Sequence, residues 1–341
     1  MTETTAGGRP LTEGELEHVL SRLDRLRREI GEVIVGQEET VEQLLVGLLA
    51  GGHCLLEGVP GLAKTLMVRT LGEAVRLSFK RIQFTPDLMP SDIIGTEILE
   101  EEHGTGRRVF RFSRGPVFAN LVLADEINRS PPKTQAALLE AMQEVEVTYA
   151  GRTYPLDRPF FVLATQNPIE QTGTYPLPEA QLDRFLLNLR IEYPTLDEER
   201  RILAETTGDR SPRVEAVMSG QEILTAQRLV RQVHMSDALV EWVTRLVRAT
   251  RPESSEVEAV REYVDWGAGP RAGQALILGG KARALLHGRF AVQVADLTAL
   301  VAPVLRHRVL VNFRGQAERI TSDRLARDVL DRVGEPRSPI A

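Results

Sequence analysis

The segment from Gly58 to Thr65, with the sequence GVPGLAKT, constrains the fold of this chain more than any other. It follows a short apolar run at 53–57 and precedes a stretch, opening at Thr65, whose apolar residues have helical spacing. A glycine-rich loop between a buried strand and a helix can aim backbone N–H groups and the helix N-terminus at a polyphosphate. Lys64 would then reach the outer phosphates, and the Thr65 hydroxyl would ligate the accompanying magnesium ion. The segment therefore predicts nucleotide binding.

Ala63 departs from the general phosphate-loop pattern, in which a glycine precedes the lysine. Alanine accepts right-handed helical geometry and resists positive φ. We therefore expect Ala63 to lie already within the first turn of the helix. The alternative interpretation of the whole segment is a Gly/Pro turn that joins a strand to a helix and carries an incidental lysine.

Two adjacent carboxylates, Asp125 and Glu126, end the apolar run at 121–124. Carboxylates at the end of a buried strand are costly unless they have a task. In a phosphate-loop enzyme, Asp125 would hold magnesium through water, and Glu126 would orient and deprotonate the water that attacks the γ-phosphate. A solvated acidic turn is the alternative for such a pair in isolation, and the phosphate loop upstream favours the catalytic interpretation.

Length and composition indicate the class of protein. A chain of 341 residues suggests two domains. The formal net charge of −6 and a pI near 5.7 argue against a general polyanion binder, so no nucleic acid is expected as a partner, although a local basic patch stays open. The single cysteine, Cys54, fits the reducing cytoplasm. The sequence contains no apolar stretch of spanning length, so no integral membrane segment is expected. The scattered histidines are interpreted as surface or packing residues.

The hydrophobic pattern predicts an α/β core followed by a helical domain. Apolar strands near 53–57, 79–85, 121–125 and 160–165 alternate with helices, which favours a parallel sheet wrapped by helices. Residues 1–10 are expected to form a disordered tail, residues 11–193 the nucleotide-binding core, and residues 194–341 a smaller all-helical domain with a C-terminal tail. Helices are predicted at about 11–30, 38–50 with Gly51 and Gly52 as the C-cap, 195–206, 220–233, 237–250, 271–287 and 294–305.

Two hairpins are predicted within the core, at about 96–112 and 144–156. The first has strand-like runs on either side of residues 103–106, and the second has them on either side of residues 150–152. Excursions of this kind from a nucleotide-binding fold often touch a substrate, while decorative surface hairpins are the equal alternative.

Three further polar residues are candidates for the site. Asn167 ends the apolar strand near 160–165, and its amide could position the attacking water; an Asn-Pro turn is the alternative. Arg184 and Arg271 carry guanidinium groups, which are always cationic and fork onto phosphate oxygens. Any single arginine is usually a solvated surface residue, and the order of the motifs distinguishes these two.

Taken together, these motifs resemble those of the MoxR family of AAA+ ATPases, over roughly residues 20 to 335. The residues that carry the resemblance are Gly58 to Thr65, Gly115 to Asn120, Asp125 to Arg129, Thr165 to Pro168, Leu182 to Phe185 and Gly269 to Ala272. An alanine before the lysine, unusual for phosphate loops in general, is familiar in this family.

The resemblance implies roles for the site residues. Asn167 is implied to be the sensor of the γ-phosphate, Arg184 the arginine finger offered to a neighbouring subunit, and Arg271 the second sensor from the helical lid. Such residues imply a homo-oligomeric ring, usually a hexamer, that binds ATP and Mg²⁺ at each junction. Ile34, Val35 and Gly36 resemble the segment that packs on adenine. The expected nucleotide contacts are Val35, Gly36, Gly58, Val59, Pro60, Gly61, Leu62, Ala63, Lys64, Thr65 and Leu66.

The resemblance also implies a chaperone-like ATPase that matures or activates protein clients, with metal-cofactor insertion alongside a von Willebrand factor A domain partner as one such role. The hairpins match the helix-2 insert and the pre-sensor hairpin of this family. A magnesium-chelatase-like subunit, a ring motor acting on nucleic acid and a nucleotide-gated scaffold are the alternatives. For Asn128 and Arg129 we expect a cap on the helix that begins at Pro131 and Pro132, rather than a place at the subunit junction.

Overall fold

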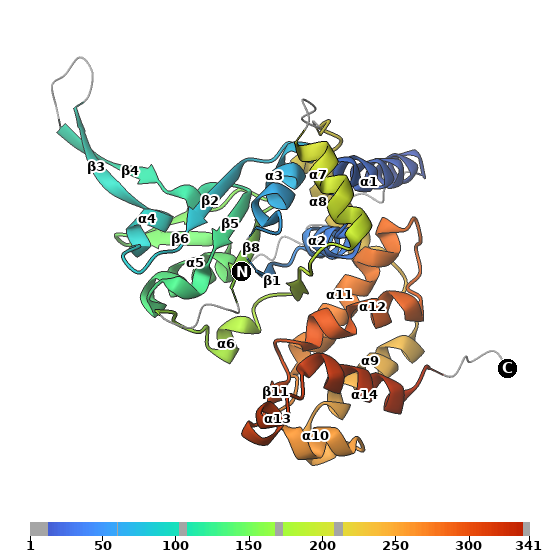
Figure 1. The fold of residues 1–341 in the computed structure, drawn as a ribbon. Coiled ribbons are helices and arrows are strands. Elements are labelled where there is room, and N and C mark those ends of the chain that lie inside the picture. The colour runs from blue at the N-terminus through green and yellow to red at the C-terminus, as the bar shows by residue number, and fades with distance from the viewer. Residues whose placement is uncertain (1–12, 60, 102–107, 168–172, 208–213, 337–341) are drawn as a thin grey trace, which may run out of the picture.

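The structure is a computed structural model that describes residues 13–59, 61–101, 108–167, 173–207 and 214–336. The expected tail at 1–10 and the hairpin tip at 103–106 lie outside these residues. The core contains a five-stranded parallel sheet with the strand order β2-β5-β8-β1-β9 (Figure 1). Its strands are β1 (Cys54–Glu57), β2 (Phe79–Gln83), β5 (Leu121–Asp125), β8 (Phe161–Gln166) and β9 (Leu187–Arg190). The prediction of a parallel sheet wrapped by helices is confirmed.

The sheet is buried on both faces because its central strands are apolar throughout. Along β5, Leu121 and Leu123 pack into one hydrophobic cluster, and Val122 and Ala124 pack into the other. This alternation is expected for a strand whose successive side chains point to opposite faces. The first cluster includes side chains of α1 (Glu13–Val33), α2 (Glu38–Ala50) and α3 (Lys64–Ala74). The second includes side chains of α5 (Pro132–Glu144), so helices cover both faces.

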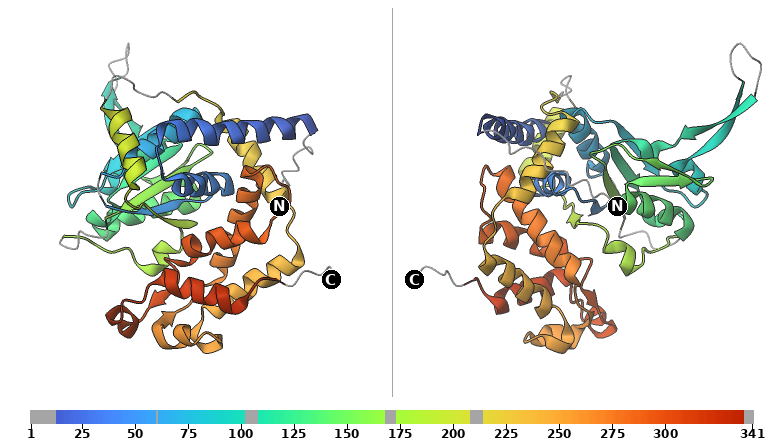
Figure 2. Two further views of the ribbon diagram at one scale, coloured as in Figure 1. Left: turned by 45° about the vertical axis from the view of Figure 1, so that its right-hand side comes forward. Right: turned by 180° about the vertical axis from the view of Figure 1, so that it is seen from behind.

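In the helical part of the chain, the orange-to-red helices lie beneath the core in both views of Figure 2, whereas the first helix, drawn in yellow, lies alongside the core. The helices of this part are α7 (Leu196–Thr206), α8 (Gly220–Gln232), α9 (Asp237–Ala249), α10 (Glu258–Tyr263), α11 (Pro270–Leu286), α12 (Val294–Leu305), α13 (Phe313–Ala317) and α14 (Ser322–Val333). Helix α11 packs on α12 and also on α2 of the core. The expectation of helices alone was wrong in one detail, because β10 (Val264–Trp266) and β11 (Leu310–Val311) form a two-stranded antiparallel ladder.

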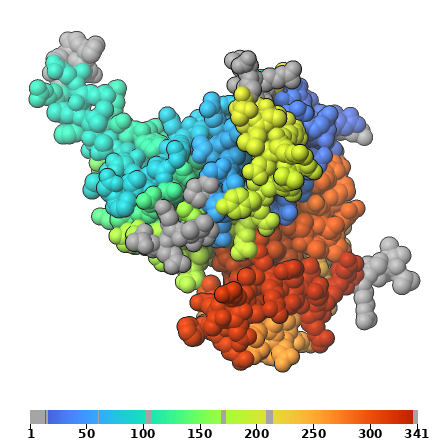
Figure 3. All heavy atoms as spheres, viewed as in Figure 1, coloured from blue at the N-terminus to red at the C-terminus, as the bar shows by residue number. Residues whose placement is uncertain are grey.

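Both predicted hairpins are present. The first pairs β3 (Gly95–Glu101) with β4 (Arg108–Arg114), and the second pairs β6 (Glu146–Tyr149) with β7 (Arg152–Pro155). Phe112 of the first hairpin stacks on Tyr154 of the second, with ring centroids 4.3 Å apart. Beyond this contact the first hairpin extends away from the body of the molecule, as Figure 3 shows.

The remaining elements are short and lie between the longer helices and the strands. They are the short helices α4 (Pro90–Ile94) and α6 (Glu179–Leu182) and the 3₁₀ turns Pro116–Phe118, Ile127–Arg129 and Pro252–Ser254. The predicted C-cap of α2 is confirmed, since Gly51 has φ 70° and its N–H bonds back to the helix. Among the described helices, none combines the length and the apolar character needed to cross a membrane.

Two buried histidines, His53 of the core and His307 of the helical part, are neutral in the folded protein. His53 lies just before β1, where its Nδ1 accepts a hydrogen bond from Val162 N and its Nε2 donates one to Met142 O, both 3.0 Å long. Burial lowers the pKa of His53 to about 4. Burial also lowers the pKa of His307 well below its usual value, and the neighbouring Arg308 acts in the same direction. Both are packing residues, one of the two kinds of position that the sequence predicts for the histidines.

We expect the free energy of unfolding to decrease as the pH falls from about 6.5 toward 4. In this range the unfolded chain binds protons at histidines that stay neutral in the folded protein, so protonation favours unfolding. For His53 alone, the shift from 6.5 to about 4 corresponds to about 2 kcal/mol lost at pH 5 relative to pH 7.5. Urea unfolding at several pH values measures this slope. His53→Gln should flatten it, whereas His234→Gln, at an exposed position, should leave it unchanged; equal slopes in all three proteins would contradict the assignment.

Candidate functional site

The phosphate loop joins the end of β1 to the start of α3, as its sequence predicts. Gly58 is packed closely, since a Cβ placed there would lie 3.1 Å from the Cβ of Ile191. Gly61 has φ +87°, in the region that favours glycine. Helix α3 begins at Lys64, so its N-terminal N–H groups open toward the loop. Pro60 lies outside the described residues.

The expectation for Ala63 was wrong. Ala63 is the N-cap of α3 and has φ 54° and ψ 19°, which is left-handed geometry rather than the right-handed geometry of a helical turn. For a residue with a Cβ this conformation costs about 1–2 kcal/mol relative to right-handed geometry. The side chain of Ala63 is exposed, so the methyl group meets no crowding that would add to this cost. The loop therefore tolerates alanine through local strain, not by extending the helix.

The Lys64 side chain is held against the phosphate loop by a backbone carbonyl group of that loop. Its Nζ donates a hydrogen bond to the carbonyl oxygen of Gly58. Partial burial lowers the pKa of Lys64, while the negative charges of Asp125 and Glu126 raise it. The phosphate loop and the acidic pair therefore share one electrostatic environment, although about sixty residues separate them in the sequence.

Asp125 is held at the carboxyl end of β5 by two neighbouring strands. Its Oδ1 accepts a hydrogen bond of 2.6 Å from the Thr165 hydroxyl of β8. Its Oδ2 accepts two from Arg81 of β2, at 2.6 and 3.0 Å. The carboxylate is 14% exposed. Asp125 and Thr65 supply hard oxygen donors of the kind that Mg²⁺ prefers, so their chemistry fits the expected ion.

Glu126 follows in a left-handed backbone conformation, with φ 58° and ψ 49°. Its N–H donates to the Thr165 hydroxyl at 2.9 Å, so this one hydroxyl bonds to both acidic residues. The side chain accepts hydrogen bonds from Gln83 at 2.9 Å and from Arg129 at 3.0 Å. A strained backbone and a carboxylate with defined partners point to a functional residue.

The capping role expected of Asn128 and Arg129 was wrong. Helix α5 begins at Pro132, and its N-cap is Pro131, whose ring offers no hydrogen-bonding group. Arg129 instead forms an ion pair with Glu126. Asn128 accepts a hydrogen bond from Tyr175 N through its backbone oxygen, and its buried Oδ1 has no hydrogen-bond partner among the described residues. The proline in the first turn is as predicted.

Asn167 lies at the same edge of the sheet as the loop and the acidic pair. It directly follows β8, which lies between β1 and β5, and it is 6% exposed. At this edge Gly58 N donates to the carbonyl oxygen of Gln166. Because parallel strands end at one edge, the three predicted motifs meet there.

The segment expected to pack on adenine lies beside α7. Gly36 has φ +68°, and a Cβ placed there would lie 2.7 Å from Glu198 Oε1 of α7. The next residue, Gln37, donates from its side chain to Glu192 O at 2.8 Å. Val35 is half-buried next to Gly36. These contacts connect the predicted adenine segment with the chain that leads from β9 into the helical part.

Arg184 and Arg271 lie elsewhere, at the opposite end of the sheet. Both line a pocket of about 220 Å³ together with Gly52, His53 and Arg308. Gly52 and His53 precede β1, whereas the phosphate loop follows it. The six residue-to-residue steps from Gly52 to Gly58 span about 20 Å in extended geometry. The structure thus brings the two arginines together and keeps both away from the phosphate loop of the same chain.

Sequence reasoning missed Arg81, Gln83 and the Arg308 side chain. Arg81 and Gln83 alternate with the buried Ile82 on β2, a pattern that marks a strand with one polar face. That this face meets Asp125 and Glu126 depends on the pairing of β2 with β5, which single-strand patterns do not specify.

We expect Lys64→Ala to weaken ATP binding by about 10- to 100-fold, because a hydrogen bond to a charged group contributes about 1.5–3 kcal/mol. Equilibrium titration with a fluorescent ATP analogue measures the effect. Lys133→Ala, at an exposed lysine of α5, is the matched control and should bind as the wild type does. Unchanged affinity in Lys64→Ala would remove Lys64 from the site.

Comparison with known families gives two matches along the chain. Residues 53–187 match the family described as "ATPase family associated with various cellular activities (AAA)". Residues 257–329 match the family described as "AAA lid domain".

Similar proteins align over nearly the whole chain. The chain is 46% identical to Chaperone MoxR1 of Mycobacterium tuberculosis, over 92% of this chain and 82% of that protein. It is 32% identical to Protein MoxR of Paracoccus denitrificans, over 82% of this chain and 86% of that protein. A solved structure of a candidate ATPase from Cytophaga hutchinsonii superimposes with a TM-score of 0.87 at 42% identity, covering 94% of this chain and 97% of the other.

Proposed function

This chain belongs to the MoxR family of AAA+ ATPases, and from that membership we propose that it is a chaperone-like protein that couples ATP hydrolysis to the remodelling or maturation of protein clients. The observation that carries the proposal is the edge of the sheet where Lys64, Asp125 and Glu126 share one environment. We also propose a division into a core at 11–193 and a helical lid domain at 194–341, since the last strand of the sheet ends at Arg190.

In the proposed reaction, the loop and Lys64 bind the phosphates of ATP, and Val35 and Gly36 contact the base. Thr65 and Asp125 would hold the magnesium ion, which when bound neutralises phosphate charge. Glu126 takes a proton from the attacking water, and Gln83 and Arg129 fix its carboxylate. Asn167 orients that water from the end of β8.

We propose that Arg184 and Arg271 act on the nucleotide of a neighbouring subunit. About 20 Å of extended chain separates their pocket from the phosphate loop of their own chain, which is further than a side chain reaches. A ring places one end of each sheet against the other end of the next, since head-to-tail contacts close by rotation. A hexamer is the form we propose, with each active site completed across a junction.

The client side of the proposal rests on the hairpins. The β3-β4 hairpin projects from the body and exposes Leu99 and Phe110, which pair across the ladder. M. tuberculosis MoxR1 bears the name chaperone, which supports a protein as the substrate. A von Willebrand factor A domain protein is the partner that we propose, with metal-cofactor insertion as one form of maturation. The single buried thiol, Cys54, agrees with a reducing, cytoplasmic setting.

Affinity capture from native lysate tests this function. The bait is Glu126→Gln protein held in ATP, with Lys64→Ala bait and nuclease treatment as controls. We expect ATP-dependent recovery of a von Willebrand factor A protein or a metalloenzyme, indifferent to nuclease. Recovery that nuclease abolishes would instead identify a nucleic-acid motor, and recovery of chelatase subunits would identify a magnesium-chelatase-like role.

A further inference from the structure

Three consecutive lid residues, Arg306, His307 and Arg308, hold the stretch of core that carries Arg184. We call residues 306–308 the lid clasp and residues 183–188 the finger segment. The clasp follows α12, and the finger segment joins α6 to β9. Every residue of the clasp bonds to a backbone carbonyl of the finger segment. The position of the lid and the position of the finger segment are therefore linked.

Arg308 makes the densest contacts of the clasp. Its side chain is 4% exposed and comes from the lid. Nη2 donates to the carbonyl oxygens of Phe185 at 2.6 Å and Asp183 at 3.3 Å, and Nη1 donates to that of Leu186 at 3.2 Å. Nε donates to the Asp183 carboxylate at 2.8 Å. The guanidinium thus grips the backbone on both sides of Arg184.

The other two clasp residues extend the grip to β9. His307 Nε2 donates to Phe185 O at 3.1 Å, and Arg306 Nη1 donates to Asn188 O at 2.6 Å. Arg306 is itself fixed by Asp323 of α14, at 2.8 Å. The finger segment is consequently anchored to the lid over its whole length.

Asp183 connects the clasp with the second arginine of the pocket. One carboxylate oxygen bonds to Arg308, and the other lies 3.5 Å from Arg271 Nη1. Arg308 is buried, whereas the Arg271 side chain is 54% exposed and Arg184 donates to Leu139 O at 2.8 Å. Asp183 therefore joins a fixed guanidinium to a solvent-facing one.

We propose that Asp183 and Arg308 are positioning residues that set Arg184 and Arg271 for hydrolysis in the neighbouring subunit. This inference rests on the proposed function, because it requires both arginines to act across a junction. A displacement of about 1 Å at a catalytic group can lower a rate by about 10²-fold, so the anchoring of the finger segment matters for the chemistry. The lid of one subunit then influences the ATPase rate of the next.

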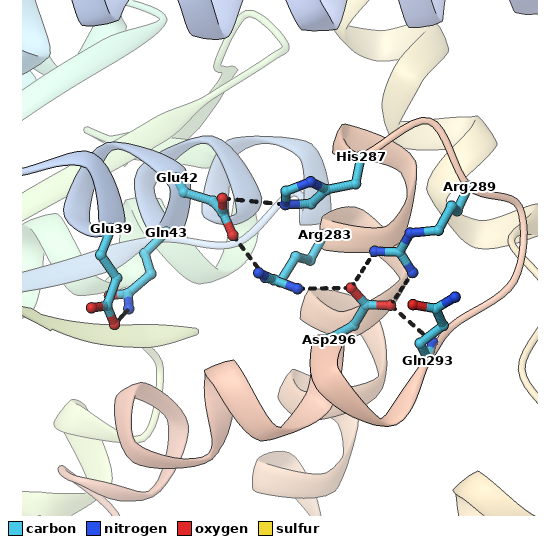
Figure 4. Close-up of polar contacts among 8 residues, drawn as sticks. All are labelled: Glu39, Glu42, Gln43, Arg283, His287, Arg289, Gln293 and Asp296. Atoms are coloured by element: carbon cyan, nitrogen blue, oxygen red, sulfur yellow. Dashed lines mark hydrogen bonds and ion pairs between the residues drawn. The ribbon is translucent and has the colours of Figure 1, made fainter.

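The test compares two carboxylates of the core, Asp183 and Glu42, that both form ion pairs with the lid. Asp183 belongs to the finger segment, and Glu42 belongs to α2. Glu42 of α2 pairs with Arg283 and His287 of α11, and Arg283 in turn pairs with the buried Asp296 (Figure 4). Glu42 and Asp183 are partly exposed to similar degrees, 22% and 32%, but the ion pairs of Glu42 go to α11 and not to the finger segment. Glu42→Gln is thus a matched control for Asp183→Asn.

We expect Asp183→Asn to lower kcat for ATP hydrolysis by about 10- to 100-fold and to leave KM within about threefold, whereas Glu42→Gln should keep kcat within about threefold of the wild type. Ring assembly is checked by light scattering in each case. Equal losses in both variants, or a loss confined to KM, would overturn the positioning role. If Asp183→Asn does not assemble, Arg308→Lys, which keeps the charge and loses the fork, takes its place in the same comparison.

Mixed rings separate a positioning role from a general structural one. Asp183→Asn subunits keep their own Glu126, so they should regain turnover when mixed with Glu126→Gln subunits, which keep intact arginines. Mixed rings of Arg184→Ala and Glu126→Gln subunits serve as the reference. If Arg184→Ala recovers and Asp183→Asn does not, the positioning inference fails alone; if neither recovers, the action across the junction fails with it.

Discussion

Replacing Glu126 with glutamine is expected to slow ATP hydrolysis by about 10²- to 10⁴-fold, the usual contribution of a general base, while ATP binding stays at the wild-type level. Glutamine keeps the size of the side chain and an oxygen that can accept the hydrogen bonds from Gln83 and Arg129. It cannot take the proton of the attacking water. Phosphate release at saturating ATP measures turnover, and equilibrium titration measures binding.

Glu140→Gln is the control for this variant, because Glu140 is an exposed carboxylate on α5. Its turnover should equal that of the wild type. Robust hydrolysis by Glu126→Gln would show that another group activates the water and would remove Glu126 from that role.

Arg184→Ala is expected to reduce hydrolysis by about 10³- to 10⁵-fold, the range known for arginines that stabilise the charge of a transferring phosphoryl group. The variant keeps every residue of its own phosphate loop and acidic pair, so each subunit should still bind ATP. The loss should appear in kcat, measured by phosphate release, with binding followed separately. Arg245→Ala, at an exposed arginine of α9, should retain wild-type turnover. Wild-type kcat in Arg184→Ala would exclude the finger role.

The edge of the sheet could be predicted from sequence because each motif there follows its own apolar strand. The strands that precede Gly58, Asp125 and Asn167 are all buried, and the carboxyl ends of parallel strands meet at one edge. Local pattern and global fold agree at these positions. The same reasoning failed for Ala63, since its left-handed geometry reflects the loop that it closes rather than the preference of alanine.

The partners of the site residues could not be predicted, because they depend on which elements become neighbours. Arg81 contacts Asp125 only because β2 pairs with β5 at that register. Arg308 contacts Asp183 across 125 residues of sequence. A buried arginine that bonds mainly to backbone carbonyls has no sequence signal of its own, and Arg308 resembles any charged residue that follows a helix.

The most direct test of an active site completed between subunits is the turnover of mixed rings of Arg184→Ala and Glu126→Gln subunits. Each variant alone is expected to be nearly inactive. In mixtures, some junctions combine the intact Glu126 of one subunit with the intact Arg184 of the next, so hydrolysis should return and be greatest near equal proportions. Mixtures that demonstrably contain both subunits and show no more turnover than the sum of the two variants would contradict the account.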